Sequence, residues 1–209
     1  MDNNMNYPRR NDIDDAGFLA ALTDTLNKKY KTGENKIYVS GISNGGMIAY
    51  KFACEYPDKV AGLGIVSANI HKNFISNCDS LFQSTPLITF NGTKDPIMPY
   101  EGGAVRITGL KWAEVESVDK SLSFINRKNQ CSKVDTTKLP DINKEDDSRV
   151  LKIVYKNCKN NDPIHFYKII DGGHAWPGGW QYLSKWVIGD MNRDIDASDR
   201  MVEFFGINH

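Results

Sequence analysis

Apolar residues near the start of the chain recur at helical spacing: Phe18, Leu19, Leu22, Leu26 and Tyr30. Together with acidic N-cap candidates just before them, they predict a helix over about Asp15–Lys29. Further helices are predicted over about Asn44–Glu55, which Pro57 ends, and around Val118–Asn129. A last helix is expected at Asp196–Phe205, with these apolar side chains facing inward: Ile195, Met201, Phe204 and Phe205.

Short β-rich or continuously apolar runs lie between these helices and predict the following strands: Lys36–Ser40, Val60–Ala68, Pro86–Asn91, Val150–Tyr155 and Ile164–Ile170. The last two alternate in polarity, so we expect them to pair through a turn at Asn157–Asp162. The polar stretch Ser132–Ser148 is predicted to be a surface excursion. Strands that alternate with helices predict an α/β fold, with a mainly parallel sheet flanked by helices on both faces.

Length and charge restrict the possible functions. The 209 residues fit one domain, residues 1–209, without an internal repeat or a linker. Lysine plus arginine and aspartate plus glutamate both number 26, so no basic surface argues for nucleic acid. No apolar run is long enough to span a bilayer, so no membrane partner is expected. The polar start, Met1–Asp15, has no signal-peptide pattern.

The clearest chemical signal is the pentapeptide Gly41–Gly45, which reads G-I-S-N-G between a predicted strand and a predicted helix. In α/β-hydrolases, a serine at such a sharp turn stands clear of the sheet as a nucleophile. We expect the glycines two residues before and two residues after Ser43 to let the turn close without side-chain clashes. The alternative is a tight glycine turn with an inert serine.

A nucleophilic serine needs a base and an acid that orients the base, and in this fold they follow in the order serine, acid, histidine. Asp95 comes just after the strand Pro86–Asn91, although an Asp-Pro pair is also ordinary turn chemistry. His174 follows the strand Ile164–Ile170 in a glycine-rich loop, which we expect to let the imidazole reach Ser43. The other histidines are less suitably placed: His71, His165 and His209.

The four cysteines form no C-x-x-C pair, so a zinc ribbon or a thioredoxin-type site is not expected. They allow three disulfide connectivities, or four unpaired thiols in a cytosolic protein. Sequence proximity weakly favours two pairs, Cys54 with Cys78 and Cys131 with Cys158.

Five separated blocks resemble the polyhydroxybutyrate depolymerase-like esterase family, whose relatives include feruloyl and acetylxylan esterases. The blocks lie in family order at Asp14–Leu22, Val39–Leu63, Asn91–Gly103, Gly172–Gly179 and Asp194–Phe205. The resemblance implies an α/β-hydrolase fold with Ser43 as nucleophile, His174 as general base and acid, and Asp95 orienting His174. It also implies that the backbone N–H of Asn44 donates one oxyanion hydrogen bond.

The resemblance has further implications outside the triad. Cysteines of the family near Cys131 and Cys158 form a disulfide, which implies a secreted or periplasmic protein. Members of the family begin with further strands and a His-Gly loop that supplies a second oxyanion donor. This chain begins at the helix before the nucleophile strand, so we expect an N-terminally truncated, C-terminal catalytic portion. The strand Lys36–Ser40 would then have an unpaired edge through which copies of the chain self-associate.

These observations predict a serine carboxylic-ester hydrolase of polyhydroxybutyrate depolymerase-like type, with a feruloyl or acetylxylan esterase as the alternative. An alternative of another class is an inactive remnant or a binding module. No metal or organic cofactor is expected, and the partner is an ester substrate, either a polyester or an acylated polysaccharide. Trp176 and Trp180 either line an acyl pocket or pack under the last helix, and Tyr100 and Glu101 are weak candidates for substrate contact.

Overall fold

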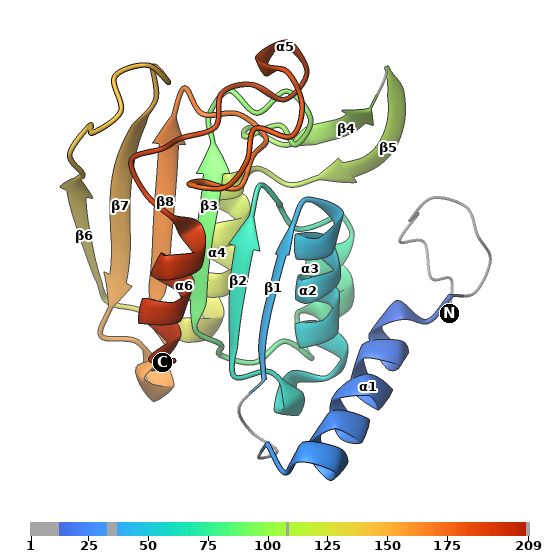
Figure 1. Ribbon diagram of the computed structural model, residues 1–209. Coiled ribbons are helices and arrows are strands. Elements are labelled where there is room, and N and C mark those ends of the chain that lie inside the picture. Colours follow the sequence, from blue (N-terminus) through green and yellow to red (C-terminus); the bar gives the residue numbers. More distant parts are fainter. Residues whose placement is uncertain (1–12, 33–36, 108, 208–209) are drawn as a thin grey trace.

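The sheet at the centre of the molecule has six strands in the order β1-β2-β3-β8-β7-β6 (Figure 1). The computed structural model describes residues 13–32, 37–107 and 109–207. The first four strands in that order are parallel, and the last two pair antiparallel. Their bounds are β1 Tyr38–Ile42, β2 Gly62–Val66, β3 Leu87–Gly92, β8 Ile164–Ile170, β7 Arg149–Lys156 and β6 Lys133–Lys138.

Strands β2 and β3 are buried along their whole length, because helices cover both faces of the sheet. This explains why their sequences are continuously apolar rather than alternating. Helices α2 (Asn44–Glu55), α3 (Phe74–Cys78) and α4 (Val118–Asn129) lie on one face, and α6 (Ala197–Phe205) lies on the other (Figure 1).

Two hydrophobic clusters divide along these two faces. The larger one contains Tyr50 of α2, Phe74 of α3 and Leu122 of α4. The smaller one contains Met201 of α6, and Phe90 of β3 stacks there on Tyr167 of β8 with ring centroids 4.7 Å apart. The inward orientation expected for the last helix is therefore confirmed.

Helix α1 (Asp15–Tyr30) packs on α2 through the small side chains Ala16 and Ala20, which contact Phe52. The apolar residues that predicted this helix lie mostly on its outer side. Four of the five are exposed, Phe18 at 65%, whereas Leu19 is partly buried against the same cluster. The periodicity predicted the helix correctly, but two alanines and Leu19, rather than the other large residues, make its contact with the domain.

The segments that the sequence did not predict are short or polar. They are the hairpin β4 (Gly103–Ile107) and β5 (Leu110–Val115), strand β6, α3 and α5 (Lys185–Ile188), with the 3-10 turns Pro57–Lys59 and Lys159–Asn161. Strand β6 lies in the stretch that was expected to be a surface excursion. It is the edge strand beside β7 and exposes most of its side chains. The strand therefore has no buried face that would show as an apolar pattern in the sequence.

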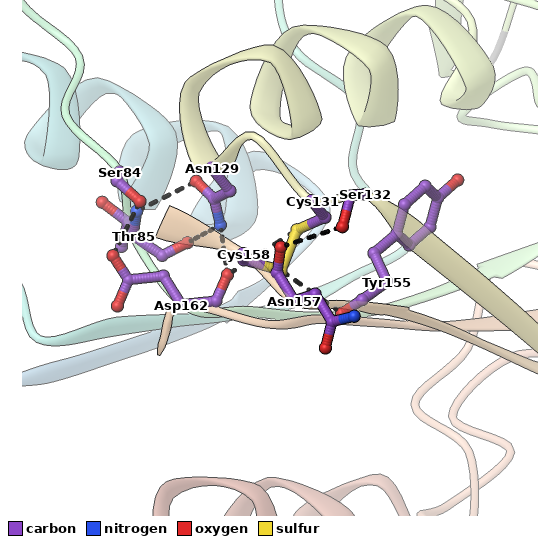
Figure 2. Close-up of a disulfide and its surroundings, with 9 residues drawn as sticks. All are labelled: Ser84, Thr85, Asn129, Cys131, Ser132, Tyr155, Asn157, Cys158 and Asp162. Atoms are coloured by element: carbon purple, nitrogen blue, oxygen red, sulfur yellow. Dashed lines mark hydrogen bonds between the residues drawn. A yellow bond between two sulfur atoms is a disulfide. The ribbon is translucent and has the colours of Figure 1, made fainter. Parts of the chain in front are cut away.

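All four cysteines are paired, Cys54 with Cys78 and Cys131 with Cys158. The pairing favoured by sequence proximity is confirmed, and the alternative of four free thiols is wrong. Cys131 follows α4 and Cys158 follows β7, so this disulfide holds the helix to the antiparallel end of the sheet (Figure 2).

Strand β1 pairs only with β2 among the strands in the described part of the chain, so one of its edges has no strand partner there. The edge expected from the sequence is therefore present. None of the helices in the described residues is long and apolar enough to cross a membrane.

Candidate active site

Ser43 lies between the end of β1 and the start of α2 with a strained backbone, at φ 56° and ψ −122°. A non-glycine residue with such a φ costs about 1–3 kcal/mol and persists only where the surroundings hold it. Here the N–H of Ser43 donates to the carbonyl of Val66 at 2.9 Å, and its carbonyl accepts from the N–H of Met47 at 3.1 Å. The strained geometry is the one expected for a nucleophilic serine at a strand-to-helix turn.

Two glycines make this turn possible, but one of them is not the glycine expected. A Cβ on Gly41 would lie 2.5 Å from the carbonyl carbon of Gly45, so only glycine fits in the strand. A Cβ on Gly45 would meet nothing within 4 Å, whereas one on Gly46 would lie 2.6 Å from the Cβ of Ala68. The crowded position on the helix is therefore Gly46, which lets α2 approach the end of β2.

Asp95 lies in the loop after β3 and is held by its own turn. Its Oδ1 atom accepts hydrogen bonds from the N–H groups of Ile97 at 2.8 Å and Met98 at 2.7 Å. Its Oδ2 atom lies 2.7 Å from Nδ1 of His174. The two interpretations of this residue are thus compatible, because one oxygen stabilises the turn while the other contacts the histidine.

His174 follows β8 and is buried, with 3% of its surface exposed. Its backbone N–H donates to the carbonyl of Ile188, and the N–H of Gly173 donates to the carbonyl of Asp190. With Nδ1 against a carboxylate, the tautomer that protonates Nδ1 leaves the Nε2 lone pair available to accept a proton.

The glycines beside His174 serve close packing rather than loop freedom. A Cβ on Gly173 would lie 2.1 Å from the carbonyl oxygen of Ile188. A Cβ on Gly92, at the end of β3, would lie 2.2 Å from the carbonyl oxygen of Gly172. The loops that carry Asp95 and His174 therefore cross in backbone contact, which fixes the two side chains against each other. The expectation that glycine gives the imidazole freedom is wrong.

The parallel strands bring three predicted residues to the same end of the sheet. Ser43, Asp95 and His174 follow the carboxyl ends of β1, β3 and β8. The structure joins Asp95 to His174 directly, and the side chain of Ser43 makes no capping hydrogen bond to helix α2. Strand β1 is two positions from β3, which is about 10 Å at the usual strand spacing.

The remaining candidates follow the same strands or begin the helix after them. Asn44 is exposed at the first position of α2, and the first N–H groups of a helix have no acceptor within it. Trp176 packs against the smaller hydrophobic cluster, and its Nε1 donates to Oγ of Ser198 on α6 at 3.1 Å. This is the packing alternative for Trp176. Trp180 does not pack under the last helix, because it is 84% exposed, and its place in a substrate pocket stays a prediction.

Tyr100 and Glu101, the weakest candidates, differ in their surroundings. The ring of Tyr100 is buried in the larger cluster, where burial raises the pKa of its hydroxyl, and that hydroxyl has no partner among the described residues. Glu101 is exposed. Among the described residues, no three histidine, cysteine, aspartate or glutamate side chains gather in an arrangement that could hold a metal ion.

No protein-family model matches the chain. The protein described as "Putative esterase NocK" of Nocardia uniformis subsp. tsuyamanensis is 23% identical over 202 residues, which cover 91% of this chain and 56% of that protein. Feruloyl esterase B of Piromyces equi is 23% identical over 179 residues, which cover 83% of this chain and 32% of that protein. The chain thus spans about half the length of the first relative and a third of the second.

A solved structure supports the fold. Acetyl xylan esterase from Aspergillus awamori superimposes with a TM-score of 0.51 at 11% identity, covering 92% of this chain and 67% of that one. At this identity the likeness concerns the fold alone. The chain has the expected α/β-hydrolase-like fold, with a mainly parallel sheet flanked by helices. The more specific likeness to polyhydroxybutyrate depolymerases stays a prediction.

Proposed function

We propose that this chain hydrolyses carboxylic esters through an acyl-enzyme on Ser43, with His174 as general base and acid and Asp95 as the group that orients His174. The observation that carries the proposal is the buried contact of 2.7 Å between Asp95 and His174. It lies at the carboxyl ends of the parallel strands, where Ser43 occupies a strained turn. Backbone strain of this kind destabilises the fold and is found mostly at functional sites, and an inert serine would not require it. The esterase relatives support the same reaction class.

The reaction proceeds in two balanced steps. In the first, Oγ of Ser43 attacks the ester carbonyl while its proton passes to Nε2 of His174. The tetrahedral intermediate collapses when that proton is delivered to the leaving alkoxide, which departs as an alcohol. In the second step, water gives a proton to His174 and attacks the acyl-serine. Collapse then releases the carboxylic acid, and the proton returns to Ser43.

The negative charge on the tetrahedral oxygen requires hydrogen-bond donors that are already in place. The N–H of Asn44 lies at the start of the twelve-residue helix α2, where the partial positive charge of the helix adds to its effect. One such donor is worth about 2.7–4 kcal/mol in the transition state. We propose Asn44 as this donor, through its backbone and independently of its side chain.

For the substrate, we favour feruloyl or acetyl esters of a plant polysaccharide over hydroxybutyrate polyesters. The support comes from the relative described as feruloyl esterase B, whose name specifies feruloyl ester hydrolysis. Measured kcat/KM values for methyl ferulate and acetylated xylan should exceed the value for hydroxybutyrate oligomers. The reverse order would favour the polyhydroxybutyrate depolymerase alternative.

A fluorophosphonate probe tests the nucleophile, because it labels serines activated by a neighbouring base. We expect one label per chain, mapped to Ser43 by peptide mass spectrometry and absent from Ser43→Ala. Ser40→Ala is the matched control, since Ser40 is an exposed serine on strand β1, which leads to Ser43. If a well-folded sample takes up no label, the chain is a catalytically inactive remnant or a binding module, and the proposal fails.

The two disulfides lead us to propose an exported protein, secreted or periplasmic, because disulfides persist in oxidising compartments. Protein isolated without reductant and denatured in the presence of a thiol reagent should contain no free thiol. Recovery of four free thiols per chain from its native source would contradict this location.

We also propose that copies of the chain associate through the open edge of β1. The exposed apolar residues Leu22 and Leu26 of α1, which precedes β1 in the chain, add apolar surface that a partner copy would cover. Light scattering after size exclusion should show mass increasing with concentration, and Leu22→Lys with Leu26→Lys should reduce it. A monomer at all concentrations would contradict the proposal.

A further inference from the structure

The segment Gly178–Gly189 carries three exposed aromatic side chains that the reaction itself does not use. Trp180 is 84% exposed, Tyr182 is 52% exposed and Trp186 is 97% exposed. We call these three residues the aromatic ridge. Two almost fully exposed tryptophans so close in sequence are unusual on a soluble protein, and exposed apolar groups of this size commonly mark an interaction site.

The aromatic ridge is attached to the catalytic candidate His174. The hydroxyl of Tyr182 donates to the backbone carbonyl of His174 at 3.2 Å. The backbone N–H of His174 donates in turn to the carbonyl of Ile188, in the short helix α5 that also contains Trp186. In Figure 1, α5 lies beyond the carboxyl ends of the parallel strands. The ridge is therefore at the end of the sheet where an ester would react.

The backbone of this segment is held in place, so the exposure is not that of a loose tail. The amide of Gln181 donates to the carbonyls of Leu183 at 2.8 Å and Gly189 at 3.1 Å. Its Oε1 accepts from the N–H of Met191 at 3.1 Å. The structure thus fixes the backbone on which the two tryptophans are displayed, which reduces the entropy lost when a ligand binds.

The segment that carries the aromatic ridge has no unpaired charge of its own. Lys185 is the only charged residue between Trp176 and Gly189, and it forms an ion pair with Asp190 at 2.5 Å. A nucleic acid or an anionic membrane would require unpaired basic residues here. The ligand that fits is therefore uncharged and presents flat apolar faces to aromatic rings.

We infer that the aromatic ridge binds the sugar chain of a neutral polysaccharide and holds it across the end of the sheet while an attached ester reacts. Sugar rings present C–H groups on their faces and hydroxyls at their rims. Trp180 and Trp186 offer large rings with one polar N–H each, which suits such a ligand. This inference rests on the proposed esterase function and adds to it a polymer-binding surface outside the reacting centre.

The test separates binding from catalysis by working in the Ser43→Ala background, where the polymer stays intact. Binding to insoluble xylan is measured by depletion of protein from solution. We expect Trp180→Ala with Trp186→Ala to weaken binding at least tenfold, and Trp186→Ala alone to weaken it by a smaller factor. Phe18→Ala is the matched control, since Phe18 is also an exposed aromatic residue, 65% exposed, but belongs to α1.

A second readout uses the same substitutions with Ser43 intact. Turnover of p-nitrophenyl acetate, a small soluble ester, should stay within twofold of the unsubstituted protein, while release of acetate from acetylated xylan falls at least tenfold. Xylan binding that is absent in the Ser43→Ala protein, or unchanged by the double substitution, overturns the inference. So does loss of self-association or of vesicle binding in the double variant. Failure of the esterase proposal itself would show as absent probe labelling, which is independent of xylan binding.

Discussion

Nδ1 of His174 lies 2.7 Å from Oδ2 of Asp95, and both side chains are buried. The other carboxylate oxygen is occupied by two backbone N–H groups, those of Ile97 and Met98. The carboxylate therefore cannot rotate away without losing those bonds, and the imidazole is held in one orientation. This leaves Nε2 as the ring atom available to take a proton from a nucleophile.

Replacing the carboxylate by an amide should remove this control. In Asp95→Asn the turn is retained if the amide oxygen accepts from Ile97 and Met98, and the amide nitrogen then faces Nδ1. That nitrogen donates, so His174 must hold its proton on Nε2 and cannot act as a base. We expect kcat for p-nitrophenyl acetate to fall by about 10³–10⁴-fold with little change in Tm.

Glu101→Gln is the matched control, because Glu101 is an exposed carboxylate close in sequence. Its kcat should remain within twofold of the unsubstituted value. If Asp95→Asn retains more than a tenth of the activity, Asp95 does not orient the base.

The crowding around the serine turn predicts opposite effects for two neighbouring glycines. In Gly41→Ala the new methyl group meets the backbone of Gly45, which cannot move aside without displacing α2. We expect a loss of about 1–3 kcal/mol in the free energy of unfolding. Gly45→Ala places its methyl group in open space within α2 and should stabilise the protein by about 0.4–1 kcal/mol. Urea unfolding measures both, and equal effects of the two substitutions would contradict this packing argument.

Elements whose ends carry strong local signals were predictable from the sequence. Helix α2 ends at Glu55, just before Pro57, and α4 begins after Ser117, whose hydroxyl caps the helix by accepting from the N–H of Lys120. For both helices the predicted bounds match the structure. Strand β6 was missed because Lys133–Lys138 is mostly exposed at the sheet edge, so no alternation of apolar and polar residues marks it.

The candidate site was predictable in its residues but not in its packing. Chain order and loop position identified Asp95 and His174, because parallel strands bring the loops at their carboxyl ends together. No sequence pattern could show that Gly46 rather than Gly45 is the crowded position, since that depends on where Ala68 lies in space. The exposure of Trp180 was likewise unpredictable, because tryptophans are mostly buried and no sequence pattern marks this one as exposed.

Asn129, at the end of α4 beside the second disulfide, hydrogen-bonds through its side chain to two other segments of the chain (Figure 2). Its Oδ1 accepts from the N–H of Thr85 at 3.1 Å, and its Nδ2 donates to the carbonyls of Thr85 at 2.8 Å and Asp162 at 2.9 Å. The side chain is completely buried, so Asn129→Ala leaves backbone groups without partners or water. We expect a loss of about 2–4 kcal/mol in the free energy of unfolding, measured by urea titration.

The control for this prediction is Ser123→Ala on the exposed side of the same helix, where the loss should stay below about 0.5 kcal/mol. Similar small losses for both variants would show that solvent reaches the groups around Asn129.

His165 should make stability fall in mild acid. Its ring lies on β8 against Phe204 with centroids 4.6 Å apart, and burial, followed by the charge of Lys152, lowers its pKa from 6.5 to about 4. The unfolded chain therefore binds the proton more readily than the folded one between these values. The contribution is complete above pH 6.5 and is lost as the pH falls towards about 4.

His165→Gln should therefore show a smaller drop in Tm between pH 7.5 and pH 5 than the unsubstituted protein. Part of the drop will remain, because burial also lowers the pKa of His71, which acts with the same sign. Thermal melts at both pH values measure the difference, and an unchanged pH dependence in the variant would exclude His165 as its source.

The two disulfides should differ in their resistance to reduction, because a thiolate must reach a sulfur atom to attack it. Cys54 and Cys78 are each 2% exposed, whereas Cys131 and Cys158 are only half-buried. Dithiothreitol under native conditions, followed by alkylation and peptide mapping, should therefore label Cys131 and Cys158 first. In denaturant the two bonds should be reduced at similar rates, since burial then protects neither. Each bond closes a loop of moderate length, separations of 24 and 27 residues, and should contribute about 3–4 kcal/mol to the free energy of unfolding. Earlier labelling of Cys54 and Cys78 in the native protein would mean that the end of α2 opens more readily than its packing implies.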